Sequence, residues 1–319
     1  MKKRNLSIEL YRIFLMFGIC LLHSIGFGQF ECTWASNILS SCVVGFVFIS
    51  GWFGVSFSWM KLLKLYGIGI YAAMIFGVIS FALGMVVDWY SAANIAYNKL
   101  THGFWFLHAY AFMMMLAPLV NSVISEGGTG IVPLLVLVWG WGFGRTLPYG
   151  DELLPKAAGL DAYGGVTLTA VYAAARVCRQ KAMAITHIKT CHLLGVLPLL
   201  LLLTGIGLGD YNSPIAFALA AVCFFMFARI KLTDRYWKFL NFLGPSMFSV
   251  YLLHTNEVGV KFITYIRDYM LKGVSSSFGC AFLTACCVFV ACVLLDMPRR
   301  MAVATISLLR NRDSRELET

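Results

Sequence analysis

The sequence predicts an all-α, polytopic integral membrane protein with about ten transmembrane helices. Of its 319 residues, 60% are hydrophobic and only 13% are charged, whereas an average soluble domain has about 25% charged residues. The mean hydropathy of the chain is +0.78. Apolar runs near the length that crosses about 30 Å of hydrocarbon recur from one end of the chain to the other. These three features exclude a soluble globular protein.

Each predicted helix follows one apolar run, with boundaries accurate to a few residues. The sixth run, YGGVTLTAVYAAARVC, is short and only weakly apolar. The predicted spans are residues 7–27, 36–56, 62–87, 104–123, 130–147, 163–178, 190–208, 212–230, 240–260 and 277–297.

The distribution of lysine and arginine predicts the orientation. With the N-terminus in the cytoplasm, 18 of the 25 Lys and Arg residues fall in cytoplasmic segments and 6 in external ones, with Arg12 inside the first helix. Positive charge gathers on the cytoplasmic side of membrane proteins, so both termini are expected there. We expect a transmembrane domain over residues 1–298 and a basic, polar cytoplasmic tail over 299–319. Because the net charge of +10 comes from these short clusters, no nucleic-acid partner is expected.

The ten cysteines predict neither a disulfide framework nor a metal site. Most lie inside apolar runs, as Cys20, Cys42 and Cys223 do, and no pair has the spacing of zinc ligands. In such positions cysteine packs as a small apolar side chain. We therefore expect no metal and no permanently bound cofactor.

Ionisable residues interrupt the first apolar run, ELYRIFLMFGICLLHS. Arg12 and His23 are eleven positions apart, which places them within roughly 20° of one direction on a helix and about 16 Å apart along its axis. Glu9 lies three residues before Arg12 and can pair with it. Ionisable side chains in hydrocarbon are costly and commonly functional. The alternatives are an Arg12 that extends to the inner headgroups and a His23 that is only a hydrogen-bonded structural residue.

The segment FSVYLLHTNEVG contains a second candidate pair, His254 and Glu257, near the outer end of the ninth span. Three residues apart on a helix, they would share a face, so that the carboxylate could orient or charge the imidazole. His23 and His254, in the outer halves of two spans, could line one cavity. The alternative is a histidine at the membrane interface.

The segment HGFWFLHAY, residues 102–110, lies at the outer entrance of the fourth span. An interfacial aromatic belt explains Trp105 and Tyr110. Alternatively, Trp105 stacks on a sugar face, and His102 and His108 contact a polar substrate at the rim.

A further stretch supplies a weaker candidate. In FVFISGWFG, residues 46–54, small Ser50 and Gly51 favour close helix packing, and a substrate contact by Ser50 is the alternative. No nucleophile elbow, phosphate-binding loop or H-E-x-x-H zinc motif is present.

Basic residues of the cytoplasmic segments could bind a phosphorylated donor through charge-assisted hydrogen bonds, although the topology explains them equally well. These donor-binding candidates are Lys61, Lys64, Arg229 and Arg235.

Taken in order, these stretches resemble the acyltransferase-3 family of bacterial inner-membrane enzymes. The resemblance covers nearly the whole chain and rests on Arg-x10-His in the first span, preceded by NLSIEL, and on FVFISG, WFL at 105–107 and FSVYLLH. One stretch departs from the pattern. Family members often carry Arg-x-x-Arg after the second span, where this chain has Lys61-Leu-Leu-Lys64, which keeps the charge but lacks the bidentate fork of arginine.

The resemblance implies an O-acyltransferase in the bacterial cytoplasmic (inner) membrane. Such an enzyme moves an acyl group, commonly acetyl, from cytoplasmic acyl-CoA to a hydroxyl of a surface or exopolysaccharide glycan. The resemblance implies His23 as the catalytic histidine and Arg12 as its motif partner. We expect His23 to act as a general base on a sugar hydroxyl and Arg12 to face the cytoplasmic donor, with an acyl-histidine relay as the alternative mechanism. The expected partners are acyl-CoA, the glycan acceptor and the lipid bilayer.

A transporter or flippase of a glycan or lipid-linked precursor is the main alternative function. Such proteins also place polar residues inside spans, but they often contain repeated halves, and no convincing repeat is present here. A glycan polymerase would be expected to have a larger external loop than residues 145–163. A noncatalytic membrane partner would leave the buried Arg12 and His23 unexplained.

Overall fold

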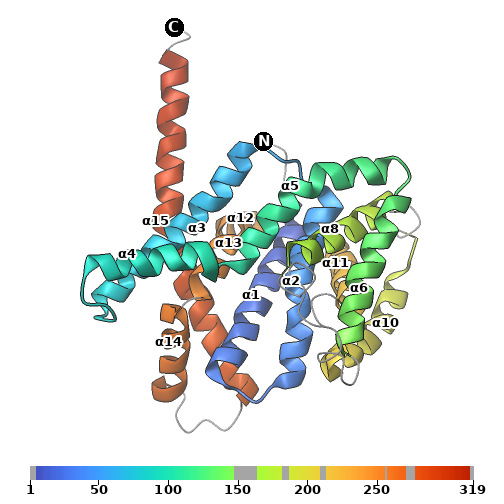
Figure 1. The fold of residues 1–319 in the computed structure, drawn as a ribbon, viewed down its shortest axis with the longest axis horizontal. Coiled ribbons are helices and arrows are strands. Elements are labelled where there is room, and N and C mark those ends of the chain that lie inside the picture. The colour runs from blue at the N-terminus through green and yellow to red at the C-terminus, as the bar shows by residue number, and fades with distance from the viewer. Residues whose placement is uncertain are drawn as a thin grey trace.

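The computed structural model describes residues 5–146, 164–181, 187–208, 213–255, 257–270 and 277–316, and within them it is helical with no strand. Two adjacent antiparallel helices, α1 and α2, lie near the centre of the bundle (Figure 1). The elements in chain order are α1 (Leu6–Gly28), α2 (Thr33–Phe53), α3 (Trp59–Ala82), α4 (Trp89–Asn98), η1 (Lys99–Gly103), α5 (Trp105–Ser125), η2 (Thr129–Ile131), α6 (Val132–Thr146), α8 (Gly165–Gln180), α10 (Thr190–Leu203), η3 (Thr204–Leu208), α11 (Pro214–Ala228), η4 (Asp234–Tyr236), α12 (Trp237–Leu243), η5 (Gly244–Ser246), α13 (Met247–His254), α14 (Glu257–Tyr265), η6 (Ile266–Met270) and α15 (Ser277–Glu316).

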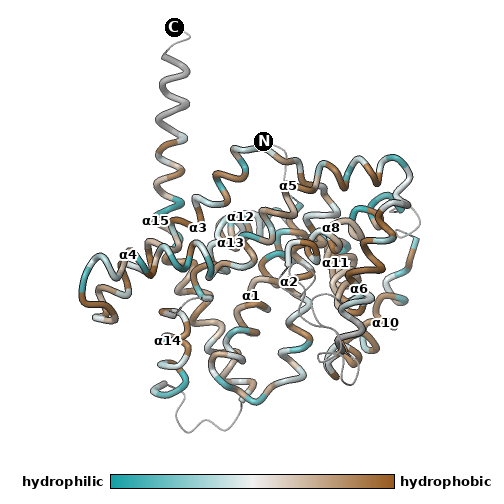
Figure 2. Tube along the Cα trace, in the orientation of Figure 1, coloured by the Kyte–Doolittle hydropathy of each residue, from teal (hydrophilic) through white to brown (hydrophobic). Residues whose placement is uncertain are grey.

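The predicted all-α membrane fold is confirmed. Among the described residues, six helical segments are long and apolar enough to cross a membrane, in α1, α2, α3, α5, α10 with η3, and α15, and shorter apolar helices lie in α6 and α11. Apolar residues predominate along these helices, and hydrophilic residues gather at the connections between them (Figure 2). The start of α1 and the end of α15 lie toward the same side of the bundle (Figure 1).

Polar capping residues set the starts of several spans. The Asn5 side chain accepts a hydrogen bond from the Ser7 backbone nitrogen at 3.1 Å and begins α1. Ser58 accepts from the Lys61 backbone nitrogen at 3.2 Å at the start of α3. Ser213 caps α11, whose first residue is Pro214. These residues satisfy amide groups that a helix start leaves unpaired.

The ninth predicted span, residues 240–260, is wrong as a single helix. The chain instead forms α12, η5, α13 and α14 in succession. Pro245 lies in η5, where its missing amide hydrogen and fixed φ interrupt a regular α-helix. Because α13 ends at His254 and α14 begins at Glu257, the expected shared helix face of these two residues is also wrong. The Glu257 side chain lies outside the described atoms, so its role stays a prediction.

Helix α8, which coincides with the weakest predicted span, is one of the most buried helices described. Residues 167–175 are all buried, and α8 packs against α2 and α5. A Cβ added to Gly51 of α2 would lie 2.4 Å from the Tyr172 carbonyl oxygen and 2.6 Å from the Ala175 Cβ. Gly51 therefore permits the close approach that its small size predicts.

Gly51→Ala should destabilise the protein, because the new methyl group meets the rigid backbone of α8. We expect a loss of about 1–3 kcal/mol in the free energy of unfolding, as for other overpacked sites. Thermal unfolding of the purified protein in detergent measures the effect as a lower Tm. The matched control is Gly67→Ala on α3, where a Cβ meets nothing within 4 Å. Equal Tm values for the two variants would contradict the packing account.

Candidate active site

Two histidines from distant parts of the chain meet at the interface of α1 and α13. The His23 Nδ1 atom lies 2.7 Å from the His254 Nε2 atom, and the ring centroids are 4.9 Å apart. His254 is fully buried, whereas His23 is partly exposed. The structure thus brings together two of the predicted site residues across 231 positions of sequence.

Hydrogen bonding defines the proton positions of this pair. The His254 Nδ1 atom lies 2.6 Å from the Val250 carbonyl oxygen, and a carbonyl oxygen can only accept, so Nδ1 of His254 carries a proton. In a neutral His254, Nε2 is then an acceptor, and Nδ1–H of His23 donates to it. The Nε2 atom of a neutral His23 consequently keeps a free lone pair, which is the form a general base requires.

Hydrogen bonds fix α1, which carries His23. Near its start, the Ser7 hydroxyl donates to the Ile230 carbonyl oxygen, and the Tyr11 hydroxyl donates to the Ala220 carbonyl oxygen at 2.9 Å. At its other end, Arg267 of η6 donates to the Gly28 carbonyl oxygen at 3.1 Å. The helix is therefore tied at both ends to later parts of the chain.

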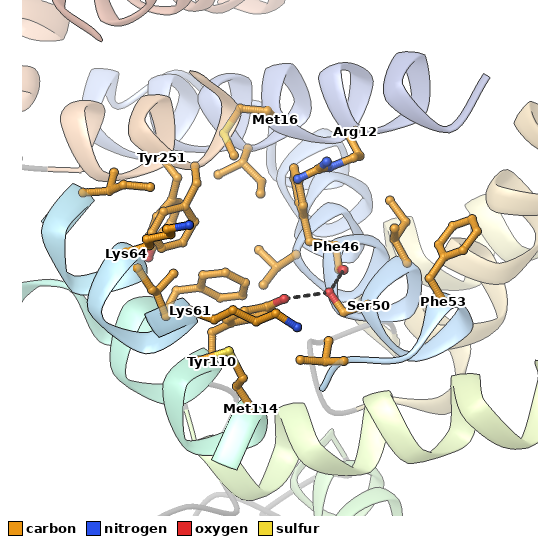
Figure 3. Close-up of a pocket in the computed structure, with 18 of the residues that line it drawn as sticks. Arg12, Met16, Phe46, Ser50, Phe53, Lys61, Lys64, Tyr110, Met114 and Tyr251 are labelled. Carbon is orange, nitrogen blue, oxygen red and sulfur yellow. Dashed lines mark hydrogen bonds between the residues drawn. The ribbon is translucent and has the colours of Figure 1, made fainter. Parts of the chain in front are cut away.

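A cavity of about 480 Å³ lies beside α1. Side chains from α1, α2, α3, α5 and α13 enclose it (Figure 3). Its lining residues are Arg12, Met16, Ile19, Val43, Phe46, Ile49, Ser50, Phe53, Gly54, Val55, Lys61, Lys64, Leu65, Ile68, Phe106, Tyr110, Met114, Phe248 and Tyr251.

The lining combines three cations with an otherwise largely apolar wall. Arg12, Lys61 and Lys64 supply the charge, and none of the described lining residues is a carboxylate. The Arg12 Nη1 atom lies 3.3 Å from Glu9 Oε1, so the predicted pair forms while the guanidinium still borders the cavity. The Lys61 Nζ atom donates to the Ser56 carbonyl oxygen at 2.9 Å and to its hydroxyl. The cavity is therefore an electropositive site for an anion with an apolar portion.

Ser50 occupies the middle of the cavity wall. Its hydroxyl donates to the Phe46 carbonyl oxygen at 3.1 Å, and its oxygen is 3.0 Å from the Tyr110 hydroxyl (Figure 3). Because the Ser50 proton is directed to the carbonyl, Tyr110 donates to Ser50. Ser50 and Tyr110 therefore form a polar pair in the cavity wall. In this stretch Gly51 serves helix packing, and Ser50 contributes a polar group to the cavity lining.

An aromatic wall leads from this polar pair toward the histidines. Tyr110 is followed by Phe106 at 5.7 Å between ring centroids, and Phe106 by Tyr251 at 5.3 Å. Tyr251 in turn lies edge-on to His254 at 6.1 Å. Aromatic residues of the kind found in an interfacial belt, here Phe106, Tyr110 and Tyr251, thus line the cavity. Sequence reasoning missed Phe106 and Tyr251, although Tyr251 precedes His254 by three residues and so shares its helix face.

The other candidates of residues 102–110 do not border the cavity. The His108 ring is used at both nitrogens: Nε2 donates to the Leu100 carbonyl oxygen at 2.9 Å, and Nδ1 accepts from the Tyr66 hydroxyl at 3.1 Å. His108 of α5 thus has a structural role, because its two hydrogen bonds connect α5 to α3 and to η1. His102 is exposed and lies beside the Thr101 hydroxyl at 2.7 Å, and Trp105 packs edge-on against Phe106.

The basic donor-binding candidates divide into two groups. Lys61 and Lys64 line the cavity. Arg229 instead donates to the Ile188 carbonyl oxygen, and Arg235 is exposed in η4, and neither lines the cavity. Among the described residues, no cluster of three or more His, Cys, Asp or Glu side chains could hold a metal ion.

A known family matches nearly the whole chain. The family model described as an acyltransferase domain, Acyl_transf_3, matches residues 5–297. The chain therefore belongs to the acyltransferase-3 family, and it is a multi-pass membrane acyltransferase. No curated protein and no solved structure matches the chain.

The hydrogen bonds of the pair predict a definite tautomer for both rings. In ¹⁵N-histidine NMR of the neutral protein, His23 and His254 should both carry the proton on Nδ1. His254→Phe removes the acceptor of His23 and should shift His23 toward the Nε2–H form. His192→Phe, on the exposed start of α10, is the matched control and should leave the His23 signal unchanged. An Nε2–H form of His23 in the unsubstituted protein would contradict the assignment.

Proposed function

We propose that the protein transfers an acyl group, acetyl in the simplest case, from acyl-CoA to a hydroxyl of a cell-surface or exopolysaccharide glycan in the bacterial cytoplasmic membrane. The observation that carries the proposal is the electropositive cavity whose buried end lies one helical turn from the His23–His254 pair. Acyl-CoA is a substrate here, and the proposal requires no resident cofactor.

The cavity suits the donor because its ends differ in character. Lys61 and Lys64 are exposed, whereas Ile19 and Tyr251 are 2% and 3% exposed. An acyl-CoA carries phosphates at one end and a thioester at the other. The lysines would bind phosphate oxygens through charge-assisted hydrogen bonds, and the apolar inner portion would receive the acyl end. Where family members often have Arg-x-x-Arg, this chain has Lys61 and Lys64. Each lysine would bind a phosphate through a single ammonium charge instead of the bidentate fork of an arginine.

The acceptor would approach His23 from the opposite side. The His23 ring stacks on Phe27, one turn further along α1, with centroids 5.4 Å apart and planes 18° apart. Beyond Phe27, α1 ends at Gly28. In the orientation that the lysines and arginines predict, this end faces the outside. Donor and acceptor would therefore reach His23 from opposite ends of α1.

The chemistry follows from the free lone pair on His23 Nε2. A glycan hydroxyl attacks the thioester carbon, the carbon–sulfur bond breaks and a carbon–oxygen ester bond forms. His23 Nε2 accepts the hydroxyl proton and returns it to the CoA sulfur, so that neutral histidine is restored. His254 acts as a positioning residue that holds His23 in the required tautomer. Arg12, about 16 Å back along α1, would act on the bound donor.

His23→Ala should reduce acyl transfer by about 10²–10⁴-fold, the usual contribution of a positioned general base. Proton NMR of the host's surface glycans, before and after mild base, measures the ester-linked acetyl groups. His192→Ala, an exposed histidine on α10, is the control at matched membrane levels and should retain transfer.

Two outcomes would contradict parts of the proposal. Full acylation by a stably inserted His23→Ala variant would remove His23 as the base while leaving an acyltransferase. No difference between the unsubstituted strain and a deletion strain would refute O-acetylation of these glycans.

A further inference from the structure

The donor cavity and the histidine pair are close but not continuous. Ile19 and Tyr251 line the cavity, but neither His23 nor His254 does. Ile19 precedes His23 by four residues and Tyr251 precedes His254 by three, so about one helical turn of roughly 5 Å separates the cavity lining from each histidine. Ile19 and Tyr251 are therefore the cavity-lining residues of α1 and α13 that lie nearest in sequence to the two histidines. Under the proposed function, a thioester in the cavity has to move past these side chains to meet His23.

The side chains of Ile19 and Tyr251 are closely packed. Ile19 and Tyr251 are 2% and 3% exposed. The Tyr251 ring contacts three other rings, with centroids 5.3 Å from Phe106, 6.4 Å from Phe248 and 6.1 Å from His254. Protein interiors are close-packed, and one additional methylene is already resisted. An acyl chain that moves from the cavity toward the histidines therefore meets closely packed side chains.

We propose that Ile19 and Tyr251 form a gate that determines which acyl groups reach His23, and that it favours short acyl chains over long ones. The inference rests on the proposed acyl-CoA-dependent function. The acyl group stays attached to CoA sulfur while it passes the gate, and the bond exchange takes place beyond it. The carbon–sulfur bond then breaks, the acyl carbon–oxygen bond forms, and the hydroxyl proton passes through His23 to sulfur.

Two properties follow from this placement. The gate discriminates between donors by the length of the acyl chain, because Ile19 and Tyr251 are largely apolar side chains at the buried end of the cavity. It does not act on CoA affinity, because the cationic residues lie elsewhere in the cavity. Widening the gate should therefore change the ratio of rates for long and short donors while the KM for acetyl-CoA stays similar.

The test compares acetyl-, propionyl-, butyryl- and hexanoyl-CoA with the purified full chain in lipid nanodiscs, with the host's surface glycan fraction as acceptor. Released CoA is separated from acyl-CoA by chromatography, because the protein's free cysteine thiols would react with a thiol reagent. The unsubstituted protein should prefer acetyl- over hexanoyl-CoA by about tenfold or more, the discrimination that added methylenes meet in an apolar pocket.

Variants of the gate should change this preference. Ile19→Ala and Tyr251→Leu should each raise the hexanoyl-to-acetyl ratio about fivefold or more, and Ile19→Val, which removes one methyl group and preserves the fold, about twofold. Tyr251→Phe keeps the ring and should keep the ratio. The matched control is Ile70→Ala on α3, where the side chain is 46% exposed.

The outcomes separate the two proposals. Unchanged ratios in active Ile19→Ala and Ile19→Val proteins, or equal use of acetyl- and hexanoyl-CoA by the unsubstituted protein, would overturn the gate and leave the acyltransferase proposal intact. No glycan-dependent CoA release from any donor would refute the proposed function and the gate with it.

Discussion

The hydrogen bond between His23 and His254 is the interaction on which the site depends. It crosses the interface of α1 and α13, and it is directed by a second hydrogen bond from His254 to the Val250 carbonyl oxygen. A buried imidazole without partners would be costly in an apolar interior. The chain satisfies both nitrogens of His254 and one of His23, which leaves the second nitrogen of His23 for chemistry. A single pair thus joins the two helices and leaves Nε2 of His23 as the nitrogen that the proposed function uses as its base.

The second constraint is the charge along α1. Arg12 lies about 16 Å from His23 on the same helix and is paired with Glu9. The cavity carries positive charge from Arg12, Lys61 and Lys64, and no carboxylate is among the lining residues that the structure describes. Under the proposed function, this charge would attract an anionic donor to one end of the helix, while the partly exposed His23 ring stacks on Phe27 near the other end. The polar residues that are costly in a membrane are therefore distributed along α1, with Arg12 beside the cavity and His23 beside His254.

Much of this arrangement could be predicted from the sequence. Apolar runs predict the long helices because a span needs about twenty apolar residues. The weak sixth run forms the helix α8, which is not among the helices long and apolar enough to cross a membrane. Helical periodicity placed Arg12 and His23 on one face and paired Arg12 with Glu9. Small Gly51 indicated a close helix contact, which the structure shows against Tyr172.

The remainder depends on contacts between distant segments, which a single sequence does not reveal. Hydrophobicity favoured a continuous helix over 240–260 and outweighed the effect of Pro245. The short helix α4 was missed because its residues, WYSAANIAYN, are less apolar than a span. The sequence does not distinguish an aromatic residue in a cavity wall from one in an interfacial belt, because the two differ only in burial. Phe106 and Tyr251 were therefore not predicted as lining residues. The bond between the two histidines joins segments 231 residues apart.

The most direct test of the central claim is the sidedness of acyl transfer. The purified protein would be reconstituted into sealed liposomes that enclose the host's surface glycan fraction, and radiolabelled acetyl-CoA would be added outside. We expect molecules whose Lys61 faces outward to label the enclosed glycan, with the label protected from an esterase added outside. Labelling that requires donor and acceptor on the same side of the membrane would contradict the proposal that they reach His23 from opposite ends of α1.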